Sequence, residues 1–382
     1  MYVWGLLPAV GWVVVRHRPG GRFRAGDKYK ASLPLPPGTK PKSHLPGTVR
    51  EPANAEKSPF VRTVFFGTPD FAVPTLRALL ESRHTVAAVV TQPDKPVGRG
   101  RKLASPPVKL LALEHGLPVL QPESVRTEEF FSEFAALEPD VAVVTAYGKI
   151  LPVPVLETPK HGCLNVHASL LPAYRGAAPV QWAIINGETR TGVTIMKMDQ
   201  GMDSGPIIAT SEVDILEDDD ARSLADLLAL EGARLMVRVL DELEETGTLP
   251  LTEQDHGAAT RAPLIKREMA RIDWSWPAET IHCAVRGFLP WPKAYTTAGG
   301  KELKITGVEA VDPAWLSATA FHERVPPGMV VDIFKGRGFV VRTGGEKEAL
   351  LVTKVQPPGR AEMGAIDFVN GGGISVGDVL GR

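Results

Sequence analysis

Short, almost wholly apolar runs alternate with amphipathic stretches through the first part of the chain, beginning near residue 61. Apolar runs without polar alternation are typical of strands that are covered on both faces, whereas apolar residues at helical spacing indicate amphipathic helices. The expected strands are 61–67, 86–92, 117–122, 140–148 and 162–169, and the expected helices are 71–83, 106–116 and 127–138. This alternation predicts an α/β fold with a doubly wound, mostly parallel, Rossmann-like sheet.

Three of these strands end in small or polar residues, at 67–69, 146–148 and 165–167. Ligands of open α/β sheets bind beyond the carboxyl ends of the strands, so these residues predict one shared crevice. The GTPDFA sequence after the first strand is not a G-x-G-x-x-G fingerprint, and no Walker pattern occurs in the chain. A dinucleotide or ATP site is therefore excluded.

The pattern changes in the second half of the chain. A strand at 206–215 and a long amphipathic helix at 223–247 complete an α/β domain at 61–250, and a polar, proline-containing linker follows at 251–275. The last domain, 276–382, opens with a helix and continues with short alternating runs separated by Gly and Pro, which is typical of a small β barrel or sandwich. The expected runs are 293–298, 302–311, 328–333, 338–343 and 349–356.

Residues 1–60 differ from the rest. The apolar stretch 1–15 is too short for a membrane span, and it has neither a basic region before it nor a clear cleavage site after it. We expect an unstructured or misassigned N-terminal extension, against the alternative of a membrane or targeting segment. This extension holds ten of the Lys and Arg residues against three acids, which leaves 33 basic and 41 acidic residues elsewhere. Any contact of the folded part with nucleic acid must therefore come from local basic patches.

The two cysteines, Cys163 and Cys283, lie far apart and have no metal-type spacing. This usage fits a reducing, cytoplasmic compartment and two buried thiols, and it offers no zinc site.

The densest group of chemically useful residues lies at 162–188. Asn165 and His167 are two positions apart on an expected strand, so their side chains point to the same face. An imidazole titrates near neutral pH and can exchange a proton with an amine, while a carboxamide can donate to an oxygen that becomes negative in acyl transfer. The alternative is a structural pair, a buried histidine beside a turn-capping asparagine. The Pro- and Gly-marked loop that follows favours a ligand site.

A carboxylate that could orient the histidine lies in the segment 196–207. Asp203 sits between Gly201 and Gly205 in a turn after a strand, and those glycines would allow its backbone to approach a ligand. Asp199 is the competing carboxylate, with the alternative of a turn residue.

A long Pro- and Gly-rich segment at 91–109 carries an excess of positive charge. Its cations are Lys95, Arg99, Arg101, Lys102 and Lys109, against the single acid Asp94. Long loops without regular structure are usually functional or disordered, and a basic loop suits a phosphate backbone. A solvated surface loop is the alternative.

Taken together, these motifs resemble the folate-dependent formyltransferases, and in particular those that act on a charged initiator tRNA. The resemblance rests on FFGTPDFA, TQPDKPVGRGRKL, NVHASLLPAYRGAAPVQWAI, TGVTIMKMDQGMDSG and RIDW, and it extends over about 61–380. The first 60 residues have no counterpart in it.

The resemblance implies a role for each matched segment. The first domain would bind 10-formyltetrahydrofolate as co-substrate, and Asn165, His167 and Asp203 would be catalytic, with no metal required. The folate-contacting stretch would be Ser169, Leu170, Leu171 and Pro172. The tRNA contacts would be Arg99, Arg101 and Lys102 in the basic loop and Lys266 in the linker, with support from an OB-like C-terminal barrel.

We therefore expect a cytoplasmic, monomeric enzyme that formylates the amine of initiator methionyl-tRNA. Relatives that share the catalytic residues formylate a sugar nucleotide or glycinamide ribonucleotide, or hydrolyse formylfolate. A non-catalytic RNA-binding relative remains the alternative of a different class, and it predicts the loss of one of the three catalytic residues.

Overall fold

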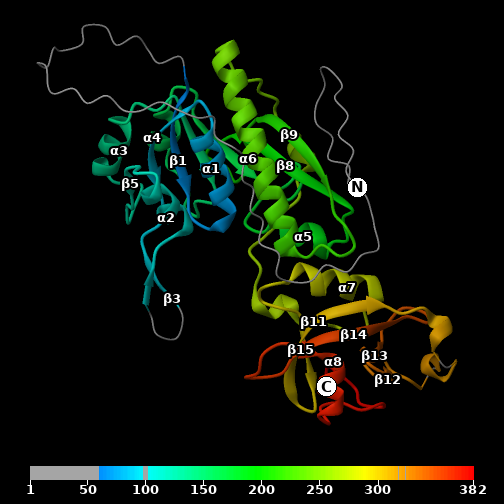
Figure 1. Ribbon diagram of the computed structural model, residues 1–382. Coiled ribbons are helices and arrows are strands. Elements are labelled where there is room, and N and C mark those ends of the chain that lie inside the picture. The colour runs from blue at the N-terminus through cyan, green and yellow to red at the C-terminus, as the bar shows by residue number, and fades with distance from the viewer. Residues whose placement is uncertain (1–59, 98–101, 317, 323) are drawn as a thin grey trace, which may run out of the picture. The chain divides into compact units, whose positions relative to one another are not determined.

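The computed structural model describes residues 60–97, 102–316, 318–322 and 324–382 (Figure 1). The predicted extension at 1–60 therefore lies outside the described residues, apart from Phe60. No helix within the described ranges is long and apolar enough to cross a membrane.

A seven-stranded sheet forms the centre of the first domain, with the strand order β5-β2-β1-β6-β7-β8-β9. Its strands are β1 Arg62–Gly67, β2 Thr85–Val90, β5 Val119–Leu120, β6 Val141–Thr145, β7 Cys163–His167, β8 Arg190–Lys197 and β9 Ile207–Asp214. The pairings from β5 to β7 are parallel, and β8 and β9 are antiparallel to their neighbours. The predicted doubly wound, mostly parallel sheet is confirmed.

Helices cover both faces of this sheet, because each central strand is apolar on both sides. One core joins the sheet to α1, α2, α5 and α6, and another joins its opposite face to α3 and α4. The helices are α1 Val73–Glu81, α2 Pro107–Glu114, α3 Glu128–Ala135, α4 Val153–Glu157, α5 Pro179–Ile185 and α6 Ala221–Thr246. Helix α6 begins at a capping box, in which the Asp220 carboxylate accepts from the amides of Arg222 and Ser223, and it ends at Gly247 with φ of 72°.

The basic segment 91–109 departs from the expected irregular loop. Lys95–Val97 (β3) and Lys102–Ala104 (β4) pair as an antiparallel ribbon. The base of this ribbon is held by Asp94, whose carboxylate accepts from Gln121, Lys109 and Ser105, and these hydrogen bonds hold the pKa of Asp94 below its usual value. Lys109 is therefore paired with Asp94.

The C-terminal domain is an antiparallel sheet with the order β10-β11-β14-β13-β12, and β15 pairs with β14. The elements are α7 Ala278–Gly287, β10 Tyr295–Ala298, β11 Lys301–Ala310, β12 Val330–Phe334, β13 Gly338–Arg342, β14 Ala349–Gln356, β15 Met363–Gly364 and α8 Ala365–Asn370. Trp274, just before the domain, is buried in its core and donates from Nε1 to the Thr296 hydroxyl at 3.0 Å. The expected domain, a helix followed by short strands, is confirmed as an antiparallel sheet domain that begins with α7.

The segment between the two domains, 251–275, contacts both of them. Thr252 exchanges two backbone hydrogen bonds with Ile207 in β9, and Ala262 donates to the carbonyl oxygen of Arg175 at 2.7 Å. Further along, Ile265 and Ile272 enter the C-terminal core. The segment expected as a polar linker therefore contributes to the packing of both domains.

Candidate active site

Asn165 and His167 lie on one face of β7, as the alternation of a strand requires. Leu164 and Val166, the neighbours in sequence, both point into the core under α6, whereas Cys163 belongs to the opposite core. Asn165 is half-buried, and its carboxamide has no hydrogen bond to any other described residue. The predicted same-face pair is thus found at the carboxyl end of a parallel strand.

The imidazole of His167 is buried and is held from one side. Its Nε2 lies 3.0 Å from the carbonyl oxygen of Tyr174, and because a carbonyl oxygen only accepts, Nε2 carries a hydrogen. Its Nδ1 lies 3.8 Å from Oδ1 of Asp203, whose side chain is 19% exposed. This separation is longer than a hydrogen bond, so Nδ1 faces the Asp203 carboxylate without bonding to it.

Asp203 occupies a turn that is fixed on several sides. Its Oδ2 accepts from the amide of Gly176 at 2.8 Å, and its backbone φ is 52°, which is unusual for a residue with a side chain. Asp199, the competing carboxylate, instead accepts from the amide of Gly201 and the hydroxyl of Ser204. The structure therefore directs Asp203 to His167 and uses Asp199 within the turn.

Gly205, two residues after Asp203, allows the turn to pack closely against β8. A Cβ atom at Gly205 would lie 1.9 Å from the carbonyl oxygen of Lys197, so the turn closes directly against the end of β8. The close approach expected at this glycine is thus made to the protein's own backbone. Gly176 is similarly confined, since a Cβ there would lie 2.6 Å from the carbonyl oxygen of Ala262.

Two buried residues that sequence reasoning missed complete this arrangement. Gln254 donates from Nε2 to the carbonyl oxygens of Asp203 at 2.9 Å and Gly205 at 2.7 Å. Its Oε1 accepts from the guanidinium of Arg175, which also lies 3.0 Å from Nδ1 of His256. Gln254 comes from the segment between the domains, so only the folded chain brings it to Asp203.

The segment after β7 is held in one shape by Thr194 of β8. The Thr194 hydroxyl donates to the carbonyl oxygen of Ser169 at 2.7 Å and accepts from the amide of Leu171 at 3.0 Å. The Ser169 hydroxyl donates to the carbonyl oxygen of Ala173 at 2.6 Å. Leu170 and Pro172 are partly exposed, so this predicted contact stretch presents apolar surface on a fixed backbone.

The ends of three parallel strands are also tied together at this edge of the sheet. The carbonyl oxygen of Tyr147, after β6, accepts from the Thr68 hydroxyl at 3.0 Å and from Nε2 of Gln92 at 3.1 Å. Thr68 follows β1 and Gln92 follows β2. Two of the three strand ends that predict a crevice, at Thr68 and Tyr147, are therefore joined at this edge.

The residues predicted to contact tRNA are placed only in part. Arg99 and Arg101 lie outside the described residues, and Lys102 opens β4. Lys266 is exposed at the start of a short 3-10 turn, Arg267–Ala270.

A cavity of about 370 Å³ beside the Asp203 turn is lined by two arginines and a histidine, namely Arg175, Arg261 and His256.

Both cysteines are free and buried, as expected. Burial raises the pKa of the Cys163 thiol to about 12.

The chain matches the family model for a formyl transferase over residues 61–240 and that for a formyl transferase C-terminal domain over residues 264–373. These two models define an enzyme class, the formyl transferases, and account for both domains. The chain is 46% identical over 319 residues to the methionyl-tRNA formyltransferase of Geobacter metallireducens, which covers 84% of this chain and 98% of the relative. The Bacillus subtilis enzyme of the same name is also 46% identical, with the same coverage. The chain belongs to the methionyl-tRNA formyltransferase family.

Solved structures share the fold at low sequence identity. HypX from Aquifex aeolicus in complex with tetrahydrofolic acid matches with a TM-score of 0.55 at 16% identity, over 82% of this chain and 47% of HypX. The chain thus spans about half of the length of HypX. An N-formyltransferase from Helicobacter canadensis, in complex with folinic acid and dTDP-3-aminofucose, matches with a TM-score of 0.55 at 19% identity, over 77% of this chain and 98% of that one.

Proposed function

We propose that this chain transfers the formyl group of 10-formyltetrahydrofolate to the free amine of initiator methionyl-tRNA, in the cytoplasm, for translation initiation. The observation that carries the chemistry is the His167 imidazole, buried beside Asn165 on one strand face with Asp203 opposite its Nδ1. The name shared by the relatives at 46% identity supports the choice of substrate.

In the proposed reaction the methionyl amine attacks the formyl carbon. A new carbon–nitrogen bond forms, and the electron pair of the carbonyl moves to oxygen as the tetrahedral intermediate develops. The free carboxamide of Asn165 donates a hydrogen bond to this oxygen, a role that is worth about 10²- to 10³-fold in kcat in related acyl transfers. Its lack of another partner among the described residues supports this role.

In the proposed reaction His167 stabilises the negative charge on the formyl oxygen, and Asp203 assists proton transfer. Because Nε2 of His167 donates to the Tyr174 carbonyl, Nδ1 is the ring nitrogen that takes up a proton during the reaction, and Asp203 opposite it stabilises the imidazolium that forms. The protonated imidazole adds a second donor for the oxyanion. Nδ1 and Oδ1 are 3.8 Å apart, so a water molecule or the amine can bind to both groups. Such catalytic contacts commonly shorten when the substrate binds.

Collapse of the intermediate breaks the bond between the formyl carbon and N10 of the folate. The amine loses one proton to Asp203, directly or through a water molecule, N10 gains one, and tetrahydrofolate leaves. This scheme uses no metal. We propose that the stretch from Ser169 to Pro172 contacts the folate, since Thr194 holds its backbone and the side chains of Leu170 and Pro172 remain partly exposed.

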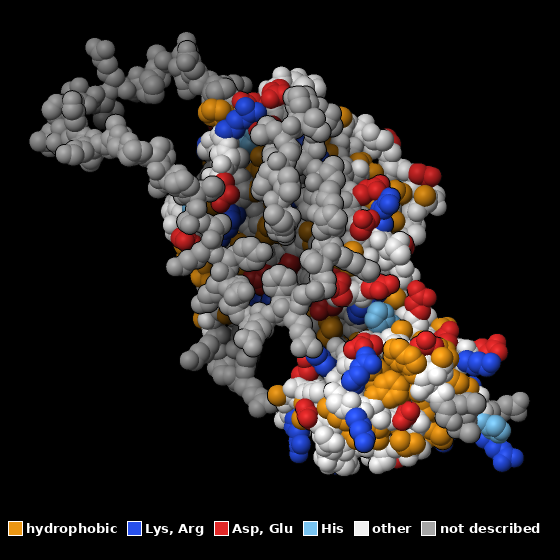
Figure 2. Space-filling view, turned by 45° about the vertical axis from the view of Figure 1, so that its right-hand side comes forward, with side chains coloured by type: hydrophobic (Ala, Val, Ile, Leu, Met, Phe, Trp, Pro, Cys, Tyr) orange, Lys and Arg blue, Asp and Glu red, His pale blue; other side chains and the backbone are white. Residues whose placement is uncertain are grey.

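Cations and aromatic side chains outside the catalytic residues suit a polyanionic substrate. We assign Arg99, Arg101, Lys102 and Lys266 to the tRNA backbone, which is bound mainly through such phosphate contacts. In the C-terminal domain, 276–382, Trp291 and Trp315 are 60% and 62% exposed, and Figure 2 shows hydrophobic side chains of the molecule's lower part lying beside Lys and Arg. Exposed aromatic rings can stack on bases, and cations can bind phosphates, so we assign this domain to tRNA binding.

The direct test compares acceptors under identical conditions. The purified full-length chain is incubated with 10-formyltetrahydrofolate and either initiator methionyl-tRNA, a nucleotide amino sugar or glycinamide ribonucleotide, while release of tetrahydrofolate and formylation of each amine are measured. The proposal predicts formylation of methionyl-tRNA alone. Transfer to a small nucleotide amine, or folate hydrolysis without transfer, would contradict it. Light scattering of the same preparation checks the proposed monomer.

A further inference from the structure

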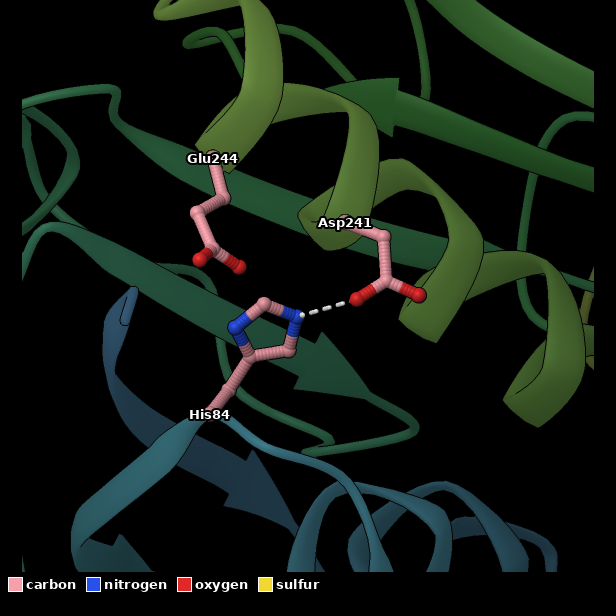
Figure 3. Close-up of side chains that lie close together, drawn as sticks. All are labelled: His84, Asp241 and Glu244. Atoms are coloured by element: carbon pink, nitrogen blue, oxygen red, sulfur yellow. Dashed lines mark ion pairs between the residues drawn. The ribbon is translucent and has the colours of Figure 1, made fainter. Parts of the chain in front are cut away.

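A second cluster of chemically active side chains lies away from the catalytic residues. His84 lies between α1 and β2, and Asp241 and Glu244 lie near the end of α6 (Figure 3). Since His84 precedes β2, it lies at the amino ends of the parallel strands, whereas Asn165 and His167 lie at the carboxyl end of β7. The cluster is therefore independent of the formyl-transfer site.

His84 is the unusual member of this cluster. Its side chain is fully buried: Nδ1 has no hydrogen-bond partner among the described residues, and Nε2 contacts Oδ1 of Asp241 at 3.2 Å. Figure 3 shows its ring pointing between the two carboxylates. Buried polar groups are rarely left without a partner, so a histidine in this state points to a ligand that accepts its lone pair.

The carboxylates are arranged to share such a ligand. Asp241 and Glu244 are three residues apart on α6 and therefore face the same side of the helix. One donor atom from each of His84, Asp241 and Glu244 lies within 4.8 Å of the others. Nε2 of His84 and Oδ1 of Asp241 are 3.2 Å apart, and two ligands bound at zinc distances in a tetrahedral site are about 3.3 Å apart.

The charge of the cluster also favours a divalent cation. Arg83 lies 2.9 Å from both Asp241 and Glu244 and 3.7 Å from Glu245, so one cation faces three carboxylates. The Arg83 side chain is 43% exposed, which allows it to leave toward solvent. A neutral imidazole and two carboxylates are ligands that suit zinc-class ions, and the remaining coordination positions would be filled by water.

We propose that His84, Asp241 and Glu244 bind a divalent transition metal of the zinc class. The metal replaces Arg83 at the carboxylates and joins the α1–β2 connection to α6. It stabilises the first domain and takes no part in formyl transfer.

The test uses untagged, full-length protein that has been stripped with a chelator and then titrated with zinc chloride alone. Calorimetry gives the affinity, thermal unfolding gives the stabilisation, and cobalt(II) absorption reports a nitrogen and oxygen ligand set. Asp241→Asn and Glu244→Gln, which replace partly exposed groups on a helix surface, are expected to weaken binding by at least roughly 10- to 100-fold. Glu242→Gln, on the exposed side of the same helix, is the control and leaves binding unchanged.

Arg83→Gln separates the proposal from a purely structural ion-pair cluster. If Arg83 competes with the metal, its removal strengthens zinc binding and increases the thermal stabilisation by zinc, although it removes three ion pairs. Zinc binding that is unchanged in Asp241→Asn and Glu244→Gln, or that is not strengthened in Arg83→Gln, would overturn the proposal. Formyl transfer should be the same in the stripped and metal-loaded wild type.

Discussion

At the scale of single residues, the shape of the Asp203 turn depends on Gln254. Asp203 has a φ of 52°, a conformation that costs about 1–3 kcal/mol unless its surroundings hold it. Gln254 holds it by donating to two carbonyl oxygens of the turn, at Asp203 and Gly205. The carboxylate that faces His167 is thus positioned by a residue of the segment between the domains.

Replacement of Gln254 by Glu tests this positioning role. The Glu side chain keeps the acceptor for Arg175 but places a carboxylate against the two carbonyl oxygens that Gln254 now bonds. We expect kcat to fall at least about tenfold while KM for the folate stays within about twofold, because the catalytic geometry is lost and the folate stretch is not. Steady-state kinetics below the unfolding temperature measure both. An equal change in the two constants would argue for a general structural role.

Cys163 supplies a prediction about pH. Burial raises the pKa of its thiol from 9.0 to about 12, so the native protein keeps this thiol protonated. Because the folded state binds the thiol proton more tightly than the unfolded state, this contribution to the free energy of unfolding is present below pH 9. It is lost as pH rises toward 12. We expect no alkylation of native Cys163 by iodoacetamide at pH 8, and rapid alkylation after unfolding, as measured by mass spectrometry. Reaction of the native thiol at pH 8 would show that it is not buried in this way.

At the scale of elements, α6 supports β7, the strand that carries the proposed catalytic pair, Asn165 and His167. Gly232 of α6 faces Val166 of β7, and a Cβ atom at Gly232 would lie 2.5 Å from Cγ1 of Val166. Val166 is flanked by Asn165 and His167, so the fit between this helix and strand fixes where those side chains point.

Gly232→Ala should therefore reduce both stability and activity. Overpacking of this kind costs roughly 1–3 kcal/mol, although alanine is otherwise the better helix former. Urea unfolding gives the change in stability, and turnover at saturating substrates gives the effect on the site. Gly247→Ala is a useful contrast, because a Cβ there meets no atom within 4 Å and its strain lies only in its φ of 72°. A fully stable and active Gly232→Ala protein would show that the helix and strand can separate without cost.

The elements also show where sequence reasoning succeeds. The strands and helices of the α/β domain follow from apolar runs and helical periodicity, which are local signals, and the same-face placement of Asn165 and His167 follows from the geometry of one strand. The ribbon β3–β4 was not predicted, because its two strands have only three residues each and lie among prolines and glycines.

At the scale of the whole molecule, the contacts that the sequence alone does not predict are tertiary contacts. The pairing of Asp203 with His167, the support from Gln254 and the gathering of His84 with Asp241 all join residues that are far apart in the sequence. Composition and spacing carry no signal for such contacts. The resemblance of the motifs to known formyltransferases suggests the proposed role of Asp203, and the folded chain adds the residues that position it.

Binding of tRNA is the property that the whole molecule must provide. We expect the double substitution Arg99→Ala and Arg101→Ala to weaken tRNA binding and to lower the slope of log affinity against log salt by about 1–2, because binding releases fewer counterions when phosphate contacts are lost. Affinity for the folate should not change. Filter binding at several salt concentrations measures the slope. An unchanged slope would remove the basic segment from the tRNA interface.

The central claim is that this strand-end site carries out formyl transfer to a charged tRNA. It is tested most directly by single-turnover formylation of initiator methionyl-tRNA by the enzyme–folate complex, in the wild type and in His167→Ala, with His115→Ala as an exposed histidine control. The account predicts that His167→Ala loses about 10²- to 10⁴-fold in rate while it still binds the folate, and that His115→Ala matches the wild type. A His167→Ala enzyme that transfers formyl at the wild-type rate would contradict it.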